Sequence, residues 1–504
     1  MMKILWIDDE VDLLKPYVYF LKEKGYEVET ATNGPDGLEL ARTKSFDLVL
    51  LDEMMVGMDG LAVLQTLKDY DPNILVAMVT KVSEEQLMNK AFGQLVDDFI
   101  IKPFTPVQIL AVLKRLIEKK ELIADRIHRE FSSIGIKRQS VQNWQDWIDH
   151  YVSILNWQST LERFGDEVLK ESFYDEKRES DKEFVQYIET YYPKWLKQGS
   201  GPVMSNRFFE SFILPKLGKK PVFLFLFDSM GLQQWLSLLP ILKEFYDIET
   251  QYYYSILPTA TPYARNALFA GMLPLEIFEK NRRYWVFEET GQNRHEEELL
   301  IENLARHQFR EKILYLKTSR NEDIESAMKT IVNANVKFAA VILNFLDLLI
   351  HSIKSQRLLD EIVTNEQSLI GLTRLWFLNS TVFTLLKALK NKDVHIIITS
   401  DHGFIKVNRP TLVYGGKEIS ANLRYKYGGA LKIDEKTAIL LDQPADYMLP
   451  VEHLGTRFAI AKSDYYFIYP TKPKEYEQTY KYSYQHGGVS MDEMILPVAF
   501  LSPR

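Results

Sequence analysis

The sequence contains no cysteine. Disulfide bonds and thiolate metal sites are therefore excluded, and any zinc must be held by histidine and carboxylate side chains. No apolar run approaches the roughly 18 residues of a membrane-spanning helix, and the first residues, MMKILWIDDE, carry charge too early for a secretory signal. We therefore expect a cytoplasmic protein without a membrane span.

Basic residues are not in excess. The 61 Lys and Arg against 69 Asp and Glu give a formal net charge of −8, which argues against a duplex-DNA-binding domain with a broad basic surface. A small anionic substrate in a local metal site remains compatible with this charge. The length of 504 residues predicts roughly three domains, which we place at 1–120, 121–205 and 206–504.

Four apolar stretches in the first 105 residues are typical of strands, and amphipathic helical stretches separate them. Their sequences are KILWIDD, FDLVLLDE, ILVAMVT and DFIIKPF. Polar residues stand at the ends of these strands: Asp8, Asp9, Asp52, Thr80 and Lys102. Because the ends of parallel strands line one crevice, three carboxylates would meet there, and their repulsion favours a bound cation such as Mg²⁺. Asp52 is then a candidate phosphoryl acceptor, with Lys102 supplying positive charge.

This set resembles the receiver domain of two-component response regulators over residues 2–120. The resemblance implies a flavodoxin-like, doubly wound parallel sheet and a sensor histidine kinase as phosphoryl donor. It also implies roles for single residues: Asp8 and Asp9 in the acidic pocket, Asp52 as phosphoacceptor, Met54 as a carbonyl ligand of Mg²⁺, and Thr80, Phe99 and Lys102 in the switch. One departure is Val56 before Gly57, where a proline is usual.

Residues 121–205 keep helical apolar spacing, and the stretch that begins KPFTPVQIL predicts that the last receiver helix continues without a Gly or Pro stop. We expect a small helical bundle as a linker domain. Its tryptophans, Trp144, Trp147, Trp157 and Trp195, are expected to be core anchors. The turn QGSGP at 198–202 is a candidate linker to the next domain.

After residue 206 strand patterns return and alternate with helical spacing, which predicts a second, larger parallel α/β sheet. The strand stretches are PVFLFLFD, EKILYLK, KFAAVILNFLD, VHIIITSD and DYYFIYP. Three of them end in Asp228, Asp347 and Asp401. Histidines accompany these carboxylates, namely His351 four residues after Asp347, His402 beside Asp401, and His486 in QHGGVS. These six donors suit two ions such as zinc or manganese.

A helix start lies between the first of these aspartates and the rest, in LPTATPYARNALFAG. We expect unpaired N–H groups there to face an anion. Locally, Thr261 is either an N-cap or a nucleophile, since threonine is a preferred cap. Nearby Arg265 is equally compatible with a phosphate contact and with an exposed ion pair, and His395 is expected to be a sheet residue rather than a ligand. The RYKYGGALK stretch fits either a single-stranded nucleic-acid platform or a surface hairpin.

The order of these motifs resembles the alkaline phosphatase superfamily, in particular its nucleotide pyrophosphatase/phosphodiesterase branch and the PglZ domains, over residues 207–504. The resemblance implies an alkaline-phosphatase-like α/β domain with two Zn²⁺ ions that hydrolyses phosphodiesters. One ion would be bound by Asp347, His351 and His486, and the other by Asp228, Asp401 and His402, with Thr261 as the nucleophile.

The order of receiver, helical middle and PglZ-type domain resembles the PorX family of response regulators, which is associated with type IX secretion. The resemblance implies a homodimer on phosphorylation. Our hypothesis for coupling is that the two copies pair through the fourth helix, last strand and last helix of the receiver. It also implies a small nucleotide or oligonucleotide substrate and contact with a sigma factor or a secretion component. Two alternatives remain open: a metal-stabilised docking module with little catalysis, and a phosphomonoesterase.

Overall fold

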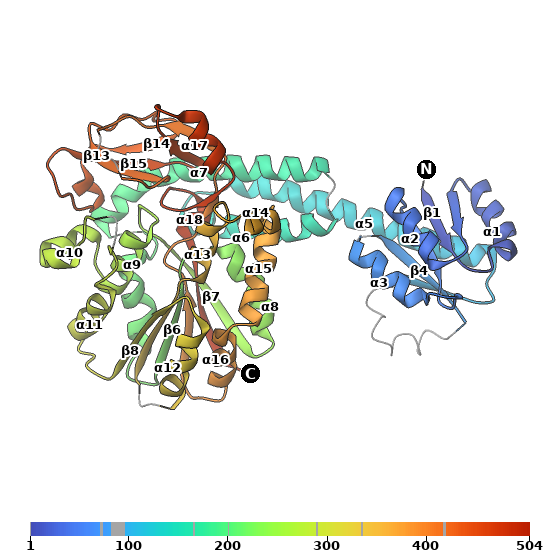
Figure 1. Cartoon of the computed structure of the whole chain (residues 1–504), viewed down its shortest axis with the longest axis horizontal. Coiled ribbons are helices and arrows are strands. Elements are labelled where there is room, and N and C mark those ends of the chain that lie inside the picture. The colour runs from blue at the N-terminus through green and yellow to red at the C-terminus, as the bar shows by residue number, and fades with distance from the viewer. Residues whose placement is uncertain are drawn as a thin grey trace. The chain divides into compact units, whose positions relative to one another are not determined.

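The computed structural model describes residues 2–70, 74–81, 96–164, 167–199, 201–288, 291–333, 336–416 and 420–504. The chain divides into two compact units, and each is described by itself. The first unit comprises residues 1–140 and 153–174, and the second comprises residues 141–152 and 175–504 (Figure 1).

The first unit is built on a five-stranded parallel sheet of order β2-β1-β3-β4-β5. Its strands are β1 (Lys3–Ile7), β2 (Glu27–Ala31), β3 (Leu48–Asp52), β4 (Leu75–Thr80) and β5 (Asp98–Ile101). One core cluster joins the sheet to α1 (Val11–Glu23) and α5 (Pro106–Gln139), and another joins it to α2 (Gly34–Thr43) and α3 (Gly60–Tyr70). The predicted doubly wound receiver fold is confirmed. The expected fourth helix falls within residues 82–95, outside the described part of the chain.

The middle of the chain is helical, as predicted. Helix α5 is continuous for 34 residues and begins with a capping box between Thr105 and Gln108. Helices α6 (Trp144–Phe164) and α7 (Glu167–Gln198) follow. Within the first unit, Trp157 packs against Phe131 and Phe173, with ring centroids 5.1 Å and 5.0 Å apart. In the second unit, Trp147 lies 5.5 Å from Phe184, so these tryptophans are core residues.

The second unit contains a six-stranded sheet of order β7-β18-β10-β6-β9-β8. The strands are β6 (Val222–Phe227), β7 (Tyr246–Tyr254), β8 (Ile313–Thr318), β9 (Phe338–Leu343), β10 (His395–Thr399) and β18 (Ile495–Pro503). The four strands β8, β9, β6 and β10 are parallel, but β18 runs antiparallel to both β10 and β7. The larger α/β domain is therefore confirmed, whereas the prediction of a wholly parallel sheet was wrong.

Helices pack around this sheet in groups (Figure 1). Helix α9 contacts α11, α15 contacts α8, and α12 contacts α16. The bounds are α8 (Leu232–Lys243), α9 (Thr261–Ala270), α11 (Glu296–Arg306), α12 (Asn321–Asn333), α13 (Phe345–Ser352), α15 (Glu366–Leu378) and α16 (Thr381–Leu389). Among the described residues no single helix has the length and apolar character of a membrane span, although the bent pair α15 and α16 together meets those two criteria.

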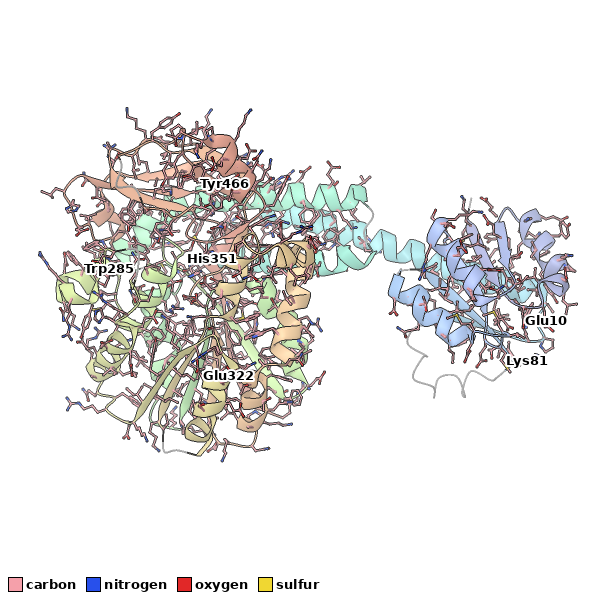
Figure 2. The ribbon with its side chains drawn as sticks, in the orientation of Figure 1. Glu10, Lys81, Trp285, Glu322, His351 and Tyr466 are labelled. Atoms are coloured by element: carbon pink, nitrogen blue, oxygen red, sulfur yellow. The ribbon has the colours of Figure 1, made fainter. Side chains whose placement is uncertain are left out.

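Smaller sheets complete the second unit. Strands β13 (Tyr425–Gly429), β15 (Thr456–Ala461) and β14 (Ala438–Leu441) form one, β12 (Arg409–Leu412) and β16 (Tyr465–Ile468) another, and β11 (Ile405–Lys406) with β17 (Tyr484–Gln485) a third. The expected strand DYYFIYP is β16 and thus lies outside the large sheet. Lys426 on β13 is buried and donates to Ser420 O at 2.8 Å, which argues against an exposed basic platform. Figure 2 shows Tyr466 in this region.

Candidate functional site

In the first unit, the strand ends bring Asp8, Asp52 and Lys102 together. Lys102 Nζ lies 3.1 Å from Asp8 Oδ2 and 2.9 Å from Asp52 Oδ1. Oxygen atoms of Asp8, Asp9 and Asp52 lie within 4.8 Å of one another. Burial raises the pKa of Asp52 and outweighs the hydrogen bond from Lys102, which lowers it. The negative charge of Asp8 raises the pKa further. A cation beside these carboxylates would relieve this repulsion.

The expected switch residues lie around this cluster. The Thr80 hydroxyl donates to the carboxylate of buried Glu53. Phe99 is partly buried against the core cluster formed with α2 and α3. Met54 is exposed and directly follows Glu53. Glu53 is a residue that the sequence reasoning missed, although it directly follows Asp52 in the strand motif.

In the second unit, the carboxyl ends of β6 and β10 position one group of three donors. Asp228 follows β6, and Asp401 and His402 follow β10. His402 Nε2 lies 3.7 Å from Asp228 Oδ1 and 3.6 Å from Asp401 Oδ2. Because β6 and β10 are adjacent parallel strands, their ends meet at one edge of the sheet. Burial lowers the pKa of His402 to about 3, which keeps its imidazole neutral, the form that binds metals.

A second group contains Asp347, His351 and His486. Asp347 and His351 are four residues apart on α13 and so share one helix face, while His486 follows β17. Asp347 Oδ1 lies 3.4 Å from the Nε2 atoms of both histidines. Burial opposes ionisation of Asp347, but the hydrogen bonds from the two imidazoles outweigh it and lower its pKa.

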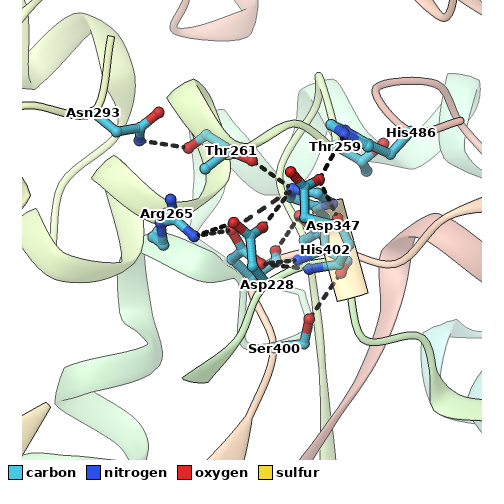
Figure 3. Close-up of polar contacts among 12 residues, drawn as sticks. Asp228, Thr259, Thr261, Arg265, Asn293, Asp347, Ser400, His402 and His486 are labelled. Atoms are coloured by element: carbon cyan, nitrogen blue, oxygen red, sulfur yellow. Dashed lines mark hydrogen bonds and ion pairs between the residues drawn. The ribbon is translucent and has the colours of Figure 1, made fainter. Parts of the chain in front are cut away.

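Thr261 lies beside the first group. It is the first residue of α9, whose N-cap is Ala260, so Thr261 is not the cap. Its Oγ1 lies 3.0 Å from His402 Nε2, and its carbonyl accepts from Asn293 at 3.0 Å (Figure 3). The expected free N–H groups are not found at the next three positions. Pro262 has none, and the N–H groups of the two following residues donate to Ala260 O.

Thr259 anchors the loop that carries His486. Its Oγ1 donates to Gly488 O at 2.7 Å and accepts from Gly487 N at 3.2 Å. Gly487 adopts a φ of +112°, which favours glycine. The imidazole of His486 stacks on that of His402 with ring centroids 4.3 Å apart. The two donor groups are therefore adjacent.

Arg265 is buried and forms ion pairs with carboxylates of other segments. Its Nη1 lies 2.6 Å from Asp228 Oδ2 (Figure 3). Its Nε lies 2.7 Å from Glu296 Oε1. Glu296 is also buried, and Lys317 lies 3.0 Å from its other oxygen. Of the two interpretations that the sequence left open for Arg265, the exposed ion pair was wrong, because the pair is buried. Arg265 instead holds the carboxylate of Asp228 in place through its Oδ2 atom.

Ser229 is another contributor that was missed. Its hydroxyl donates to Asp347 Oδ1 at 2.9 Å, and its N–H donates to Asp401 Oδ1 at 3.4 Å. Ser229 has a φ of +64°, an uncommon conformation for a residue with a side chain. Its place directly after Asp228 was the available signal. Ser229 thereby joins the two donor groups.

The donor chemistry of the second unit fits two zinc ions. Each group offers carboxylate oxygen and imidazole nitrogen, with ligating atoms within 4.8 Å of one another. Asp228 Oδ1 and Asp401 Oδ2 are buried and have no hydrogen-bond partner among the described residues. The Nε2 atoms of His351 and His486 face each other at 3.0 Å. If both atoms were unprotonated they would repel at this distance, whereas a proton on one of them or a shared cation makes the contact favourable.

The helical region contacts the chain segment behind His402, within the second unit. Tyr151 on α6 donates to Asp492 Oδ1 at 2.6 Å, and Lys177 on α7 lies 3.4 Å from the same oxygen. Asp492 belongs to the short helix α18 (Met491–Met494). A Cβ added at Gly403 would lie 2.0 Å from Asp492 O. Helices α6 and α7 therefore contact Asp492, and the backbone of Asp492 packs against Gly403, the residue after His402.

Comparison with known families assigns three segments of the chain. Residues 4–114 match the response regulator receiver domain, residues 116–196 match the PorX response regulator linker domain, and residues 208–500 match the BREX system PglZ alkaline phosphatase-like domain. None of these three families is described as a DNA-binding domain, and the third is described as alkaline phosphatase-like.

Individual relatives match through the receiver. The chain is 34% identical over 124 residues to the alkaline phosphatase synthesis transcriptional regulatory protein PhoP of Bacillus subtilis, covering 24% of this chain and 51% of PhoP. It is 31% identical over 117 residues to the transcriptional regulatory protein ResD of the same organism, covering 23% of this chain and 48% of ResD. The chain thus spans about half the length of the curated relatives it matches.

Among solved structures, the receiver domain of NtrX from Brucella abortus is 32% identical, with a TM-score of 0.22, covering 23% of this chain and 98% of that chain. The chemotaxis protein CheY4 of Vibrio cholerae is 30% identical, with a TM-score of 0.21, covering 23% and 98%. The PglZ match alone covers more than half of the sequence. The chain therefore belongs to the PglZ family of alkaline-phosphatase-like proteins, joined here to a receiver and a linker domain in a PorX-like architecture.

Proposed function

We propose that the second unit is a zinc-dependent phosphodiesterase that acts on small nucleotide or oligonucleotide phosphodiesters. The observation that carries the proposal is the convergence of Thr261 with two Asp/His donor groups at one edge of the sheet. Asp347, His351 and His486 would hold one zinc ion, and Asp228, Asp401 and His402 the other. A docking module has no need of a hydroxyl directed at such a cluster, so Thr261 favours catalysis.

Two zinc ions bound here would supply positive charge that lowers the pKa of a nearby hydroxyl and stabilises charge on the phosphoryl group. The Thr261 oxygen attacks phosphorus, a bond from Thr261 Oγ1 to phosphorus forms, and the bond to the leaving alcohol breaks. Water then hydrolyses the resulting phosphodiester between Thr261 and the retained alcohol, which releases a phosphomonoester and regenerates the hydroxyl. Asn293 fixes the Thr261 backbone, and Arg265 fixes the carboxylate of Asp228.

We propose that the first unit controls this activity. Asp52 would accept a phosphoryl group from a sensor histidine kinase, with Mg²⁺ held by Asp8, Asp9, Asp52 and the Met54 carbonyl. Lys102 already contacts Asp52, while Thr80 and Phe99 would respond to the phosphoryl group. Homodimerisation would follow. The contacts from α6 and α7 to Asp492 support transmission toward His402.

The PorX-like architecture extends the proposal to regulation of type IX secretion. A sigma factor or a component of the secretion machinery would then be the downstream partner. Deletion of the chain's gene from its host, followed by measurement of secreted proteins, tests this part separately from the chemistry. Unchanged secretion would reject the assignment without affecting the phosphodiesterase.

The experiment that tests catalysis compares the wild type with Thr261→Ala on bis(p-nitrophenyl) phosphate and linear oligonucleotides, with zinc content measured in parallel. We expect Thr261→Ala to bind zinc and remain folded while turnover falls at least about 100-fold. Thr381→Ala is the matched control because Thr381 is also the first residue of a helix, and it should keep full activity. Chelation should abolish wild-type turnover.

Three outcomes discriminate between the alternatives. If Thr261→Ala retains turnover, Thr261 is not the nucleophile. If the wild type cleaves p-nitrophenyl phosphate better than the bis ester, the domain is a phosphomonoesterase. If zinc binds and stabilises the fold but no ester is cleaved, the domain is a metal-stabilised docking module.

A further inference from the structure

A cavity with a volume of about 350 Å³ lies next to the start of α9. Tyr263, two residues after Thr261, forms part of its wall. Four further aromatic residues line it: Trp285, Phe287, Tyr427 and Phe458. The volume lies in the range of about 300–1,000 Å³ that small-molecule sites occupy. Figure 2 shows Trp285 in the second unit.

The aromatic rings form a continuous packed wall. The ring of Tyr263 lies 5.5 Å from that of Trp285 and 6.2 Å from that of Phe458, measured between centroids. Tyr427 lies 5.5 Å from Phe458 with an interplanar angle of 31°. Trp285 and Phe458 are buried. The tertiary structure therefore holds these rings in place, which lowers the conformational entropy cost of stacking a ligand on them.

The cavity is tied to the catalytic residues by direct contacts. Gln292 lines the cavity, and its carbonyl accepts from Asn266 on α9 at 3.2 Å. The adjacent Asn293 donates to Thr261 O at 3.0 Å. On the other side, the ring of Tyr425 packs between Tyr263 and the backbone of Gly487, which follows His486. Thr261 and the cavity wall are thus parts of one packed structure.

The lining indicates the class of ligand. No lysine or arginine is among the described residues that line the cavity, and its titratable lining residues other than tyrosine are Glu452 and His453, so a second phosphate finds no permanent cation there. Gln292, Thr456 and the backbones of Gly428 and Gly429 offer hydrogen-bonding groups beside the rings. A flat group with hydrogen-bonding edges matches this combination, since aromatic side chains stack on nucleobases of any sequence.

We propose that this cavity binds the nucleobase of the substrate whose phosphoryl group reacts at Thr261. The inference rests on the proposed phosphodiesterase function and places the base of its nucleotide substrate in this cavity. Base stacking on an aromatic side chain accounts for a factor of about 10 or more in affinity. We therefore expect kcat/KM to depend on a base attached to the phosphoryl group.

The test uses two esters that share one leaving group. The first is the p-nitrophenyl ester of thymidine 5′-phosphate, and the second is its abasic analogue, in which hydrogen replaces the base. The wild type should cleave the thymidine ester with a kcat/KM at least about 10-fold higher. Tyr427→Ala should lower kcat/KM for the thymidine ester about 10-fold and change that for the abasic ester less than about 2-fold.

Matched variants separate stacking from general damage. Tyr427→Phe keeps the ring and should retain the preference for the base, although it loses the hydroxyl that donates to Phe287 O. Tyr476→Ala removes a tyrosine of the same unit that packs on Tyr469 and Tyr480 and does not line the cavity. It should leave both esters unaffected. Trp285→Ala provides a second wall variant with the same expected selectivity loss.

Equal cleavage of the two esters by the wild type, or an equal loss for both in Tyr427→Ala, would overturn the proposal. If the wild type cleaves neither ester in the presence of zinc, the phosphodiesterase proposal fails instead. The cavity is then tested by calorimetric titration with thymidine 5′-phosphate and deoxyribose 5-phosphate. Tighter binding of the nucleotide, lost in Tyr427→Ala, would support the base site, and equal binding would reject it.

Discussion

Replacing Arg265 with methionine removes a buried guanidinium from three carboxylates, those of Asp228, Glu296 and, at 3.6 Å, Asp401. Arg265 is 2% exposed and pairs with Asp228 at 2.6 Å and with Glu296 at 2.7 Å. Removing one partner of a buried ion pair costs about 3–5 kcal/mol, because the remaining charge is left buried without compensation. Glu296 keeps Lys317 at 3.0 Å and the Tyr315 hydroxyl at 2.6 Å, so Asp228 dominates the loss. We therefore expect a loss of about 3–5 kcal/mol in total.

The free energy of unfolding is measured by urea titration with a chelator present, so that no bound metal compensates for the lost cation. Arg320→Met is the matched control. Arg320 also pairs with an aspartate, Asp323, at 2.7 Å, but its side chain is 71% exposed. An exposed pair contributes about 0–1 kcal/mol, so the control should unfold close to the wild type.

A double-mutant cycle then tests whether the loss is electrostatic. Arg265→Met combined with Asp228→Asn should lose less stability than the sum of the single variants, with a coupling of about 0.5–3 kcal/mol. An Arg265→Met protein that unfolds within about 1 kcal/mol of the wild type would refute the reasoning. So would strictly additive losses, which would indicate that Arg265 acts through packing alone.

Three further perturbations are expected to have distinct outcomes. Burial raises the pKa of Asp181 to about 7, so the folded state binds more protons than the unfolded state between about pH 4 and 7, and stability falls as pH rises through that window. Asp181→Asn should remove up to about 1.4 kcal/mol per pH unit of this slope in urea titrations, and parallel profiles would contradict it. Gly403→Ala places a Cβ 2.0 Å from Asp492 O and should cost more than about 2 kcal/mol and lower zinc affinity, whereas Gly371→Ala meets nothing within 4 Å and should be neutral or stabilising by about 0.5–1 kcal/mol in the same thermal melts. Beryllofluoride should raise the dimer fraction of the wild type in light scattering but not that of Asp52→Asn, and an unchanged monomer fraction in the wild type would reject the dimer.

Strand ends could be predicted from the sequence because they depend on local patterns. The apolar runs before Asp52, Asp228 and Asp401 are long enough to be buried strands, and parallel strands place their carboxyl ends at one edge. The receiver fold and the α/β character of the second unit follow from this periodicity. The antiparallel strand β18 was missed because its stretch, ILPVAFLSP, contains two prolines, and direction is set by pairing with β10 and β7.

Ion pairs and cavities are harder to predict because they join distant segments. Arg265 has the spacing of a helix residue on α9, and no neighbouring residue in the sequence indicates that it pairs with Glu296, which in turn pairs with Lys317. The same applies to Lys426, which alternates with tyrosines as an exposed cation would, although the neighbouring sheet buries it. Burial of a charge depends on which segments cover it, and that information lies in tertiary packing rather than in residue spacing.

The aromatic cavity, a candidate functional feature, could not be predicted from the sequence for the same reason. Its wall comes from a helix with Tyr263, a loop with Trp285 and strands with Tyr427 and Phe458, and so from segments far apart in the sequence. In the sequence Tyr427 belongs to a basic and aromatic stretch that suggested an exposed platform. In the fold the basic side chain of Lys426 is directed to Ser420 O and Tyr469 OH, while Tyr427 lines the cavity. Successive side chains of a strand point to opposite faces of the sheet. The structural Lys426 and the neighbouring Tyr427, which we propose binds a ligand, therefore lie on different faces.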